Sequence, residues 1–343
     1  MNRLAAPRTL SKLRVALAPA SAGRRSAARR SLLGLELAVH LPLMEFGSEG
    51  QSLARIGGAV DAARQSGFAA VSANDHFLFR APWLDGPTAL ATVIERSGAM
   101  ELATTVALVA LRGPVPLAKT LAALDVLSDG RVVAGVGPGS SERDYDAVGV
   151  PYDERRERFD EAVASLRSLL RGDPAPETHR HYALPGSQLA PAPRRPGGIP
   201  IWIGSWGSKA GLRRVARLGD GWLASAYNTT PDSFRAAKES LSERLDSHGR
   251  DPGRFPNALA TMWTWITEDA RQADRVLREV LAPLLRRDPD ALRDQLCVGP
   301  ARSARSCSHA TRRQAVSACT SGRCATSLSR SSSRRRPCFP PSK

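Results

Sequence analysis

Two hydrophobic periods alternate along the chain between residues 35 and 300. Runs of consecutive apolar and β-branched residues, as at 104–110 and 131–136, indicate buried parallel strands. Segments in which apolar residues recur at helical spacing, as at 51–66 and 117–127, lie between such runs. Strands that alternate with helices at this short spacing predict an α/β fold with a parallel sheet and crossover helices.

The expected elements extend over most of the chain. Strands are predicted at 35–41, 68–72, 104–110, 131–136, 199–204, after a turn at 219–221, and at 257–266. Helices are predicted at 51–66, 86–98, 117–127, 151–170, up to residue 218, and at 231–248 and 268–285. A Pro-rich segment at 172–198 has no strong periodicity. Segments of that length without secondary structure are usually functional or mobile loops.

A polar run directly follows the strand predicted at 68–72, where Asn74, Asp75 and His76 stand in sequence. In a βα barrel the carboxyl ends of the strands are where the chemistry is built. Because imidazole titrates near neutral pH, His76 is a candidate for proton transfer. The alternative is that Asp75 caps a helix while His76 is solvated, and the spacing alone does not separate the two. His40 is more typical of a packed strand residue than of a ligand.

A glycine-rich loop follows the strand at 131–136. The run 135–139 departs from the dinucleotide-binding fingerprint, since Ser140 stands where the third glycine belongs and Pro138 interrupts the turn. The backbone N–H groups and hydroxyls of this loop suit a polar ligand, with a plain turn as the alternative. Tyr145 follows closely enough to donate a hydrogen bond into the same site.

A second glycine- and serine-containing loop precedes the helix that ends near residue 218. Backbone N–H groups at a helix start, together with Ser205, Ser208 and Lys209, predict a phosphate-binding site. The alternative is simple N-capping of the helix by Ser205 or Ser208.

The strong basic charge belongs to the two ends of the chain. The formal net charge of the 343 residues is +16, which on its own would indicate a nucleic-acid partner. Of the 49 Lys and Arg residues, 18 lie in residues 1–34 and 301–343, where there is no acidic residue. Residues 35–300 therefore contain 31 basic and all 33 acidic residues, a net charge of −2. A nearly neutral body argues against nucleic-acid binding, and no apolar run reaches the ~18 residues of a membrane helix.

Both ends differ in composition from the body. Residues 1–34 are rich in Arg, Ala and Ser, which fits either a transit-type leader or translated sequence upstream of the true start. The body has no cysteine before Cys297, as expected of a cytoplasmic protein without a disulfide framework. Cys307, Cys319 and Cys324 in the final segment match no standard zinc spacing, so no metal site is predicted.

Three blocks of sequence resemble the luciferase-like flavin- or F420-dependent oxidoreductases. They are GFAAVSANDHF (67–77), LAKTLAALDVLSDGRVVAGVGPGSSERDYDAVGVPYDERRERFDEAV (117–163) and IPIWIGSWGSKAGLRRVARLGDGW (199–222). The blocks occur in the order and at the spacing of that family, and the resemblance covers roughly residues 35–266. It is specific for the family and the fold and much less so for the substrate.

The resemblance implies a (β/α)8 TIM barrel over residues 35–300, with 172–198 inserted as a lid over the site. Residues 1–34 would form a disordered basic leader. In residues 301–343, where relatives supply an eighth strand and a closing helix, the periodicity fails, so both are expected to be missing. We interpret this Ser/Arg/Cys-rich, disordered tail as the product of a reading-frame shift near codon 300, with a genuine basic extension as the alternative.

The resemblance also implies the chemistry. The expected function is an FMN-dependent monooxygenase that uses O2 on a small organic substrate, with coenzyme F420 and hydride transfer as the alternative. A flavin reductase that supplies reduced flavin, and a homodimer, are compatible with it. His76 would be catalytic, and a non-proline cis peptide bond between Thr105 and Val106 would support the cofactor ring. The expected cofactor-binding residues are Asp75, Thr105, Val106, Gly137, Gly139, Ser140, Tyr145, Gly204, Ser205, Ser208 and Lys209.

Two hypotheses in which the protein has no catalytic activity are also compatible with the sequence. The first is a flavin-binding relative inactivated by its altered C-terminal segment, because a barrel that lacks a strand has two unpaired edges. The second is a nucleic-acid binder that acts through its basic ends, whose affinity would fall steeply with salt.

Overall fold

The computed structural model describes residues 36–45, 50–173, 180–182, 184, 188–261, 263–300 and 322–326. All of them belong to one compact unit, Ser31–Lys343. The predicted leader, residues 1–34, and most of the predicted tail lie outside the described residues.

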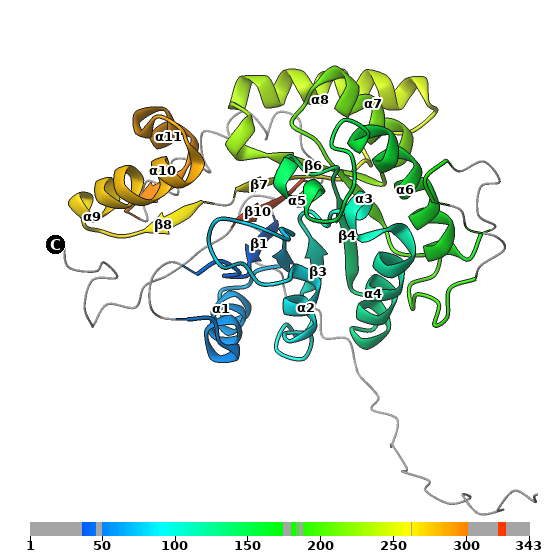
Figure 1. Ribbon diagram of the computed structural model, residues 1–343, viewed down its shortest axis with the longest axis horizontal. Coiled ribbons are helices and arrows are strands. Elements are labelled where there is room, and N and C mark those ends of the chain that lie inside the picture. Colours follow the sequence, from blue (N-terminus) through cyan, green and yellow to red (C-terminus); the bar gives the residue numbers. More distant parts are fainter. Residues whose placement is uncertain are drawn as a thin grey trace, which may run out of the picture. The chain divides into compact units, whose positions relative to one another are not determined.

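A closed barrel of parallel strands forms the centre of this unit (Figure 1). Its order is β1-β10-β7-β6-β5-β4-β3-β2, and the pairing of β2 with β1 closes the barrel. The strands are β1 (Glu36–His40), β2 (Ala70–Ala73), β3 (Glu101–Thr104), β4 (Val132–Val136), β5 (Ile201–Gly204), β6 (Gly221–Ser225), β7 (Asn257–Thr261) and β10 (Gly322–Thr326). The predicted α/β class and TIM-barrel architecture are therefore confirmed.

The eighth position of the barrel differs from the expectation. β10 lies in the segment that was predicted to contain no strand, yet it fills the gap between β1 and β7, with Arg323 opposite Glu36 and Ala258. Two parallel edges with unpaired N–H and C=O groups attract any extended segment through backbone hydrogen bonds, which need no apolar pattern in the added strand. The closing helix would lie in residues 327–343, outside the described residues.

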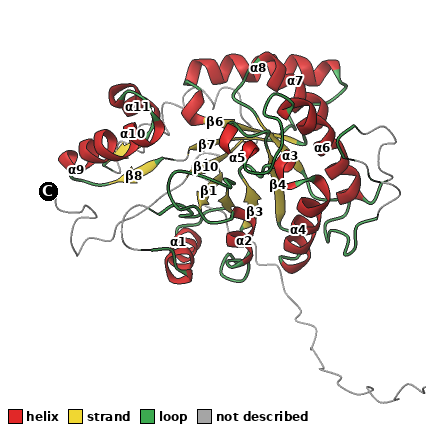
Figure 2. Cartoon of the chain, in the orientation of Figure 1, coloured by secondary structure: helices red, strands yellow, loops and turns green. Residues whose placement is uncertain are grey.

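Helices surround the strands, as Figure 2 shows. They are α1 (Leu53–Gln65), α2 (Gly86–Ala91), α3 (Val109–Arg112), α4 (Pro114–Leu127), α5 (Glu142–Asp146), α6 (Arg155–Arg171), α7 (Lys209–Leu218), the 3-10 helix η1 (Ala226–Asn228) and α8 (Pro231–Ser247). The main core lies between the outer face of the barrel and these helices, where Val60, Leu102, Leu121 and Phe159 are fully buried.

After β7 the chain leaves the barrel and forms a side module at residues 263–300. It consists of β8 (Thr264–Ile266), α9 (Ala270–Arg275), the π-helix η2 (Val276–Leu281), α10 (Ala282–Leu285), α11 (Pro289–Gln295) and β9 (Cys297–Gly299). β8 and β9 pair in parallel as a separate two-stranded sheet. The strand predicted at 257–266 is thus two strands, one in the barrel and one in the module.

Two other predicted elements have different bounds. The strand expected at 104–110 is β3, which ends at Thr104, because the chain turns through a cis bond and then forms α3. The helix expected at 86–98 is α2, which ends at Ala91 and is followed by turns. In both places the apolar pattern is correct for burial but does not distinguish a regular element from a packed turn.

The described residues of the predicted lid pack on the outside of α4 and α6. The backbone N–H groups of His181 and Tyr182 donate to Glu161 on α6, at 2.8 and 2.7 Å. Those of Arg194 and Arg195 donate to Asp125 on α4, at 2.8 and 3.1 Å. Whether the segment covers the site stays a prediction, since residues 174–179, 183 and 185–187 lie outside the described range.

Candidate active site at the carboxyl ends of the strands

A cis peptide bond joins Thr105 to Val106 directly after β3, at the position expected from the resemblance. The side chain of Val106 lies against the glycines that end β4 and β5. A Cβ atom at Gly137 would be 2.7 Å from Val106 Cγ2, and one at Gly204 would be 2.9 Å from Val106 Cγ1. Four residues of the predicted site, Thr105, Val106, Gly137 and Gly204, are therefore brought together in one closely packed wall.

Asp75 holds the segment that carries the cis bond. Its backbone N–H donates to Val106 O at 3.1 Å, and its carboxylate accepts from the backbone N–H of Leu108 at 3.2 Å. The carboxylate also accepts from Nε and Nη2 of Arg112, at 2.5 and 2.6 Å. Asp75 is 3% exposed and both of its carboxylate oxygens accept hydrogen bonds, so this side chain holds the segment with the cis bond in position. Its contact with a cofactor stays a prediction.

Arg112 bridges two carboxylates. Besides Asp75 it contacts Asp85, which caps α2 by accepting from Thr88 N at 2.9 Å. Burial lowers the pKa of Arg112, but the hydrogen bonds and charges of Asp75 and Asp85 outweigh it and raise the pKa above its ordinary value. The guanidinium also lies over the Phe77 ring, 5.2 Å from its centroid. This network fastens the loops after β2 and β3 to one another.

His76 pairs with a buried carboxylate. Its Nδ1 lies 2.9 Å from Asp144 Oδ2, and the other oxygen of Asp144 accepts from the backbone N–H groups of Phe77 and Leu78, at 3.0 and 2.8 Å. Burial raises the pKa of Asp144, but these hydrogen bonds and the neighbouring imidazole outweigh it, so the pKa lies below its ordinary value. A carboxylate on Nδ1 directs Nε2 of His76 toward other partners.

The glycine loop after β4 is ordered by its own residues. Gly139 has a φ of 76°, which favours glycine. Tyr145 is fully buried and its hydroxyl donates to Pro138 O, so the expected hydrogen bond from Tyr145 into the site is replaced by an internal one. Burial raises the pKa of this phenol. Ser140 is exposed, and its carbonyl oxygen accepts from the hydroxyl of Tyr152 at 3.1 Å.

The loop after β5 begins α7. Ser208 is the N-cap, and its hydroxyl accepts from Gly211 N at 3.2 Å, as the capping alternative requires. Ser205 is buried, and its hydroxyl accepts from Gly207 N at 3.2 Å. Lys209 is exposed at the first position of the helix. The residues predicted to bind phosphate thus lie together at a helix N-terminus, and their binding of an anion stays a prediction.

His40 ends β1 as a packed residue. Its Nδ1 lies 2.7 Å from Leu41 O, and burial lowers its pKa to about 4, so the imidazole is neutral at physiological pH. The interpretation of His40 as a packed strand residue agrees with this geometry.

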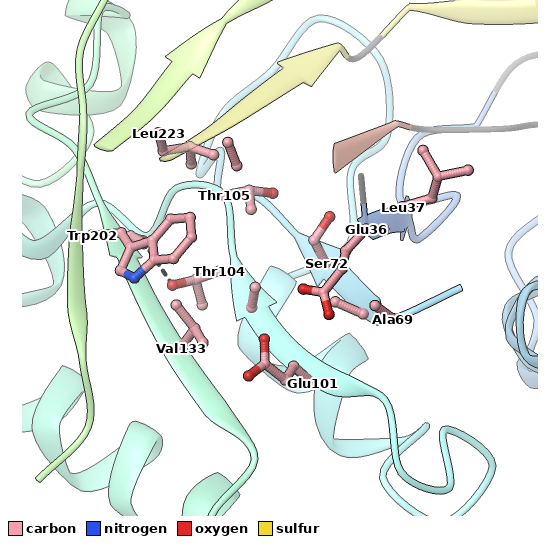
Figure 3. A pocket seen from close by; sticks show the side chains of 15 residues that line it. Glu36, Leu37, Ala69, Ser72, Glu101, Thr104, Thr105, Val133, Trp202 and Leu223 are labelled. Carbon is pink, nitrogen blue, oxygen red and sulfur yellow. Dashed lines mark hydrogen bonds between the residues drawn. The ribbon is translucent and has the colours of Figure 1, made fainter. Parts of the chain in front are cut away.

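Below the cis bond, the inside of the barrel is hollow. A cavity of about 50 Å³ lies among small inward-facing residues of the strands (Figure 3). Trp202, Leu223 and Thr105 line it on one side, and Glu36 and Glu101 at the starts of β1 and β3 on another. Thr105 Oγ1 is buried there without a hydrogen-bond partner among the described residues.

The part of the chain that the structure describes contains neither a metal-binding cluster nor a membrane-spanning helix. Within the described ranges, no group of three His, Cys, Asp or Glu side chains is arranged to hold a metal ion. Likewise, none of the helices described is long and apolar enough to cross a membrane.

Sequence reasoning missed Arg112 and Asp144 as parts of the site. Asp144 follows the glycine loop, and Arg112 follows the strand that leads into the cis bond. A charged residue next to an apolar strand end is a signal, but its partner lies 68 residues away for Asp144 and 37 for Arg112. The pairing is visible only when the loops are brought to the same edge of the barrel.

Residues 37–322 match the family model of luciferase-like monooxygenases. The chain belongs to this family. Its relatives include a 5,10-methylenetetrahydromethanopterin reductase of Methanolobus tindarius, 26% identical over 242 residues, which are 71% of each chain. The corresponding reductase of Archaeoglobus fulgidus is 30% identical over 51% of each chain.

Solved structures of luciferase-like proteins share the fold. The monooxygenase RslO1 from Streptomyces bottropensis has a TM-score of 0.71 at 19% identity, over 85% of this chain and 92% of that one. An F420-dependent secondary alcohol dehydrogenase in complex with an F420-acetone adduct has a TM-score of 0.72 at 17% identity, over 85% and 93%. At these identities the likeness shows the fold alone.

Proposed function

We propose that this luciferase-like protein is an oxidoreductase that binds coenzyme F420 and transfers hydride to or from an organic substrate. The observation that carries the proposal is the pair of His76 and Asp144, 2.9 Å apart, at the carboxyl ends of the strands. Hydride transfer to a carbonyl needs a proton at the oxygen, and the reverse reaction needs a base there. The relatives named as reductases support hydride transfer as the reaction class.

The residues at this end of the barrel fit a cofactor with a planar ring and a phosphate. Val106, seated over Gly137 and Gly204, would support the ring, since a side chain at either glycine would displace that wall. The N-terminus of α7, with Ser208 and Lys209, would hold the phosphate. When bound, the deazaflavin supplies the hydride or accepts it.

The chain's own residues have separate tasks in this proposal. His76 holds or releases the proton at Nε2. Asp144 holds Nδ1–H and so fixes the ring orientation and the tautomer. Asp75 and Arg112 hold the cis segment in place, so that the ring is supported from a fixed position.

The second candidate is the FMN-dependent monooxygenase that the sequence first suggested. The likeness of the fold to RslO1 and to the FMN-bound oxygenating constituent of 3,6-diketocamphane monooxygenase keeps it in consideration. It would require a source of reduced flavin, which makes a flavin reductase its expected partner.

Gel filtration of the purified chain with F420, and separately with FMN, tests the proposal. Coelution of the F420 absorbance with the protein supports hydride transfer, and coelution of FMN alone moves the assignment to the monooxygenase. Retention of neither, by a protein that elutes as a folded species, overturns the cofactor assignment.

Analogues of F420 and FMN that lack the phosphate test whether Lys209 contacts that group. Lys209→Ala should weaken F420 or FMN binding but leave the binding of the riboflavin-type analogue without the phosphate unchanged. Equal loss for both would show that Lys209 does not contact the phosphate. Lys238→Ala on α8 serves as the control for a general loss of positive charge.

A further inference from the structure

The inside of the barrel holds smaller side chains than the inside of a parallel barrel usually does. Large branched side chains, arranged in layers, normally fill this space. Here β1, β2, β3 and β7 contribute small residues to it, namely Ala38, Ala70, Ser72, Ala103 and Ala258. These side chains are too short to meet in the middle, so a cavity of about 50 Å³ remains.

Trp202 on β5 lines the cavity without filling it. A Cβ atom at Gly221 would be 2.6 Å from the indole, so the ring lies against the backbone of the neighbouring strand β6. Figure 3 shows Trp202 and Val133 on one side of the space and Ser72 on the other. The absence of a side chain at Gly221 thus lets the indole lie back and leaves the space open.

The hydroxyl groups that line the cavity offer little to a polar ligand. Thr104 Oγ1 donates to Gly135 O at 2.7 Å, and Ser72 Oγ donates to Val39 O at 3.5 Å. Among the described lining residues, Thr105 Oγ1 is the one hydroxyl left without a partner. A buried water needs roughly two to four polar partners, so this single hydroxyl does not hold one.

The two ends of the cavity differ. Glu36, Ala69 and Glu101 stand at or directly before the starts of β1, β2 and β3, and they line one end. Each of them is only partly buried, so solvent reaches the cavity at the amino-terminal ends of the strands. Thr105 lines the other end, directly before the cis bond. A molecule can therefore enter without passing the residues assigned to the cofactor.

The size and polarity of the cavity define the ligand. Apolar cavities stay dry and accept apolar molecules, and one of about 150 Å³ accommodates benzene, a ring of six carbon atoms. By proportion, a cavity of about 50 Å³ has room for about two heavy atoms. We propose that the inside of the barrel binds an uncharged apolar molecule of the size of dioxygen, which enters at the amino-terminal ends of the strands. The inference goes beyond the proposed function and does not depend on which cofactor binds.

Thr105 connects this cavity with the candidate active site. Its side chain lines the cavity, and its carbonyl group belongs to the cis bond that leads to Val106. Val106 in turn lies against Gly137 and Gly204 in the wall assigned to the cofactor ring. A small molecule in the cavity is thus held behind that wall, where it does not compete with an organic substrate for the opposite end of the barrel.

Alanine-methyl NMR spectra of the full chain under xenon gas test the site. Xenon should shift the methyl resonances of Ala70 and Ala103 with a saturable dependence on pressure. Ala62 is exposed on α1, and Ala134 is fully buried in the main core outside the barrel, so both serve as controls. The resonances of the two controls should move only linearly with pressure. Linear shifts at all four alanines would overturn the proposal.

Dissolved oxygen serves as the second probe. Because dioxygen is paramagnetic, it should broaden the methyl resonance of Ala70 more strongly than that of Ala134, although both residues are buried. Equal broadening would exclude dioxygen from the cavity and overturn the assignment. A nuclear Overhauser effect between water and the Ala70 methyl group, without a xenon shift, would show that the cavity holds water and would overturn it as well.

Variants that fill the cavity provide an independent readout. Ala103→Val adds two carbon atoms, so it should abolish the saturable xenon shift at Ala70 and leave the melting temperature unchanged or raise it. Ala70→Val is a second such variant, read out at Ala103. Ala134→Val, in the packed core, should lower the melting temperature through overpacking. A persistent xenon shift in both filled variants, or losses of melting temperature equal to that of Ala134→Val, would overturn the proposal.

The outcome is separable from that of the cofactor experiment. Bound F420 or FMN should leave the xenon shifts in place, because the two sites open at opposite ends of the barrel. Loss of the shifts on cofactor binding would contradict a separate entrance. A chain that shows the xenon shifts but retains neither cofactor keeps the cavity site and loses the proposed function.

Discussion

Val106 and Gly137 are packed so closely that a single added methyl group would not fit between them. A Cβ atom at Gly137 would lie 2.7 Å from Val106 Cγ2, well inside van der Waals contact. The side chain after the cis bond thus depends on the absence of a side chain at the end of β4. Because both residues belong to the wall assigned to the cofactor ring, this contact links the stability of the barrel to the shape of the site.

Gly137→Ala should lower the free energy of unfolding by about 1–3 kcal/mol, because the new methyl group displaces Val106. The double variant Gly137→Ala/Val106→Ala should recover part of that loss, since the smaller side chain leaves room. Urea unfolding of the single and double variants measures the coupling. Gly58→Ala, on the exposed side of α1 with no atom near the new Cβ, should instead stabilise the protein by about 0.5–1 kcal/mol. A Gly137→Ala variant as stable as the wild type would refute the close contact.

Arg112→Ala should destabilise the protein by about 3–5 kcal/mol, because the buried carboxylate of Asp75 loses its counter-charge. Asp75 and Arg112 have side chains that are 1% and 19% exposed. Thermal and chemical unfolding measure the change. Arg235→Ala breaks a pair with Asp232 in which the side chains are 41% and 81% exposed, so it should cost no more than about 1 kcal/mol. Similar losses in the two variants would contradict a special role for Arg112.

Asp144→Asn should show a pH-dependent stability difference from the wild type. The pKa of Asp144 is lower in the folded than in the unfolded protein, so the charged carboxylate stabilises the fold above its ordinary pKa of about 3.9. That contribution is lost as the pH falls through the lower, folded-state pKa. The difference in free energy of unfolding between variant and wild type should therefore be largest near neutral pH and shrink below about pH 4. A difference that is constant from pH 7 to pH 3 would contradict this pairing.

His76→Ala should reduce kcat by about 10²–10⁴-fold if His76 moves the proton at the reacting oxygen. The protein should still retain its cofactor on gel filtration, which separates catalysis from binding. His248→Ala, on an exposed histidine at the end of α8, is the matched control and should leave kcat unchanged. Unaltered turnover by a folded His76→Ala variant would assign the proton to another group.

Truncation after residue 321 should remove β10 and leave β1 and β7 without partners. We expect a broad, weakly cooperative unfolding transition and a tendency to aggregate, since open strand edges pair with other chains. Truncation after residue 326 keeps β10 and should unfold cooperatively, as the full chain does. Circular dichroism melts and light scattering of the two truncated proteins measure the difference. Equal cooperativity would show that β10 does not contribute to the barrel in solution.

The sequence was sufficient for those features that depend on local pattern. Hydrophobic spacing placed most of the parallel strands and most helices, but not β10, and the resemblance placed the cis bond at Thr105 and Val106. His76 was found because a polar run follows an apolar strand. These signals lie within a few residues of each other, so no knowledge of distant contacts is needed to detect them.

The remaining features depend on contacts between distant segments. The carboxylate of Asp75 is engaged by Arg112 and Leu108, and the hydroxyl of Tyr145 by Pro138, so their tasks could not be read from residue type. β10 has no apolar alternation that would predict a strand. It is positioned by backbone pairing with two neighbouring strands, β1 and β7. Trp263 lies far along the chain from Trp83, and only the course of the side module brings the two rings together.

The pairing of β10 with β1 determines when the barrel can close during synthesis of the chain. The two strands are far apart along the chain, with Glu36 opposite Arg323. During synthesis β1 leaves the ribosome long before β10 has been made, so the barrel can close only after β10 has been synthesised. Contacts between segments so far apart slow folding, because the intervening loop must be ordered first. We therefore expect chaperones to bind the nascent chain at the edge of β1 that is still unpaired.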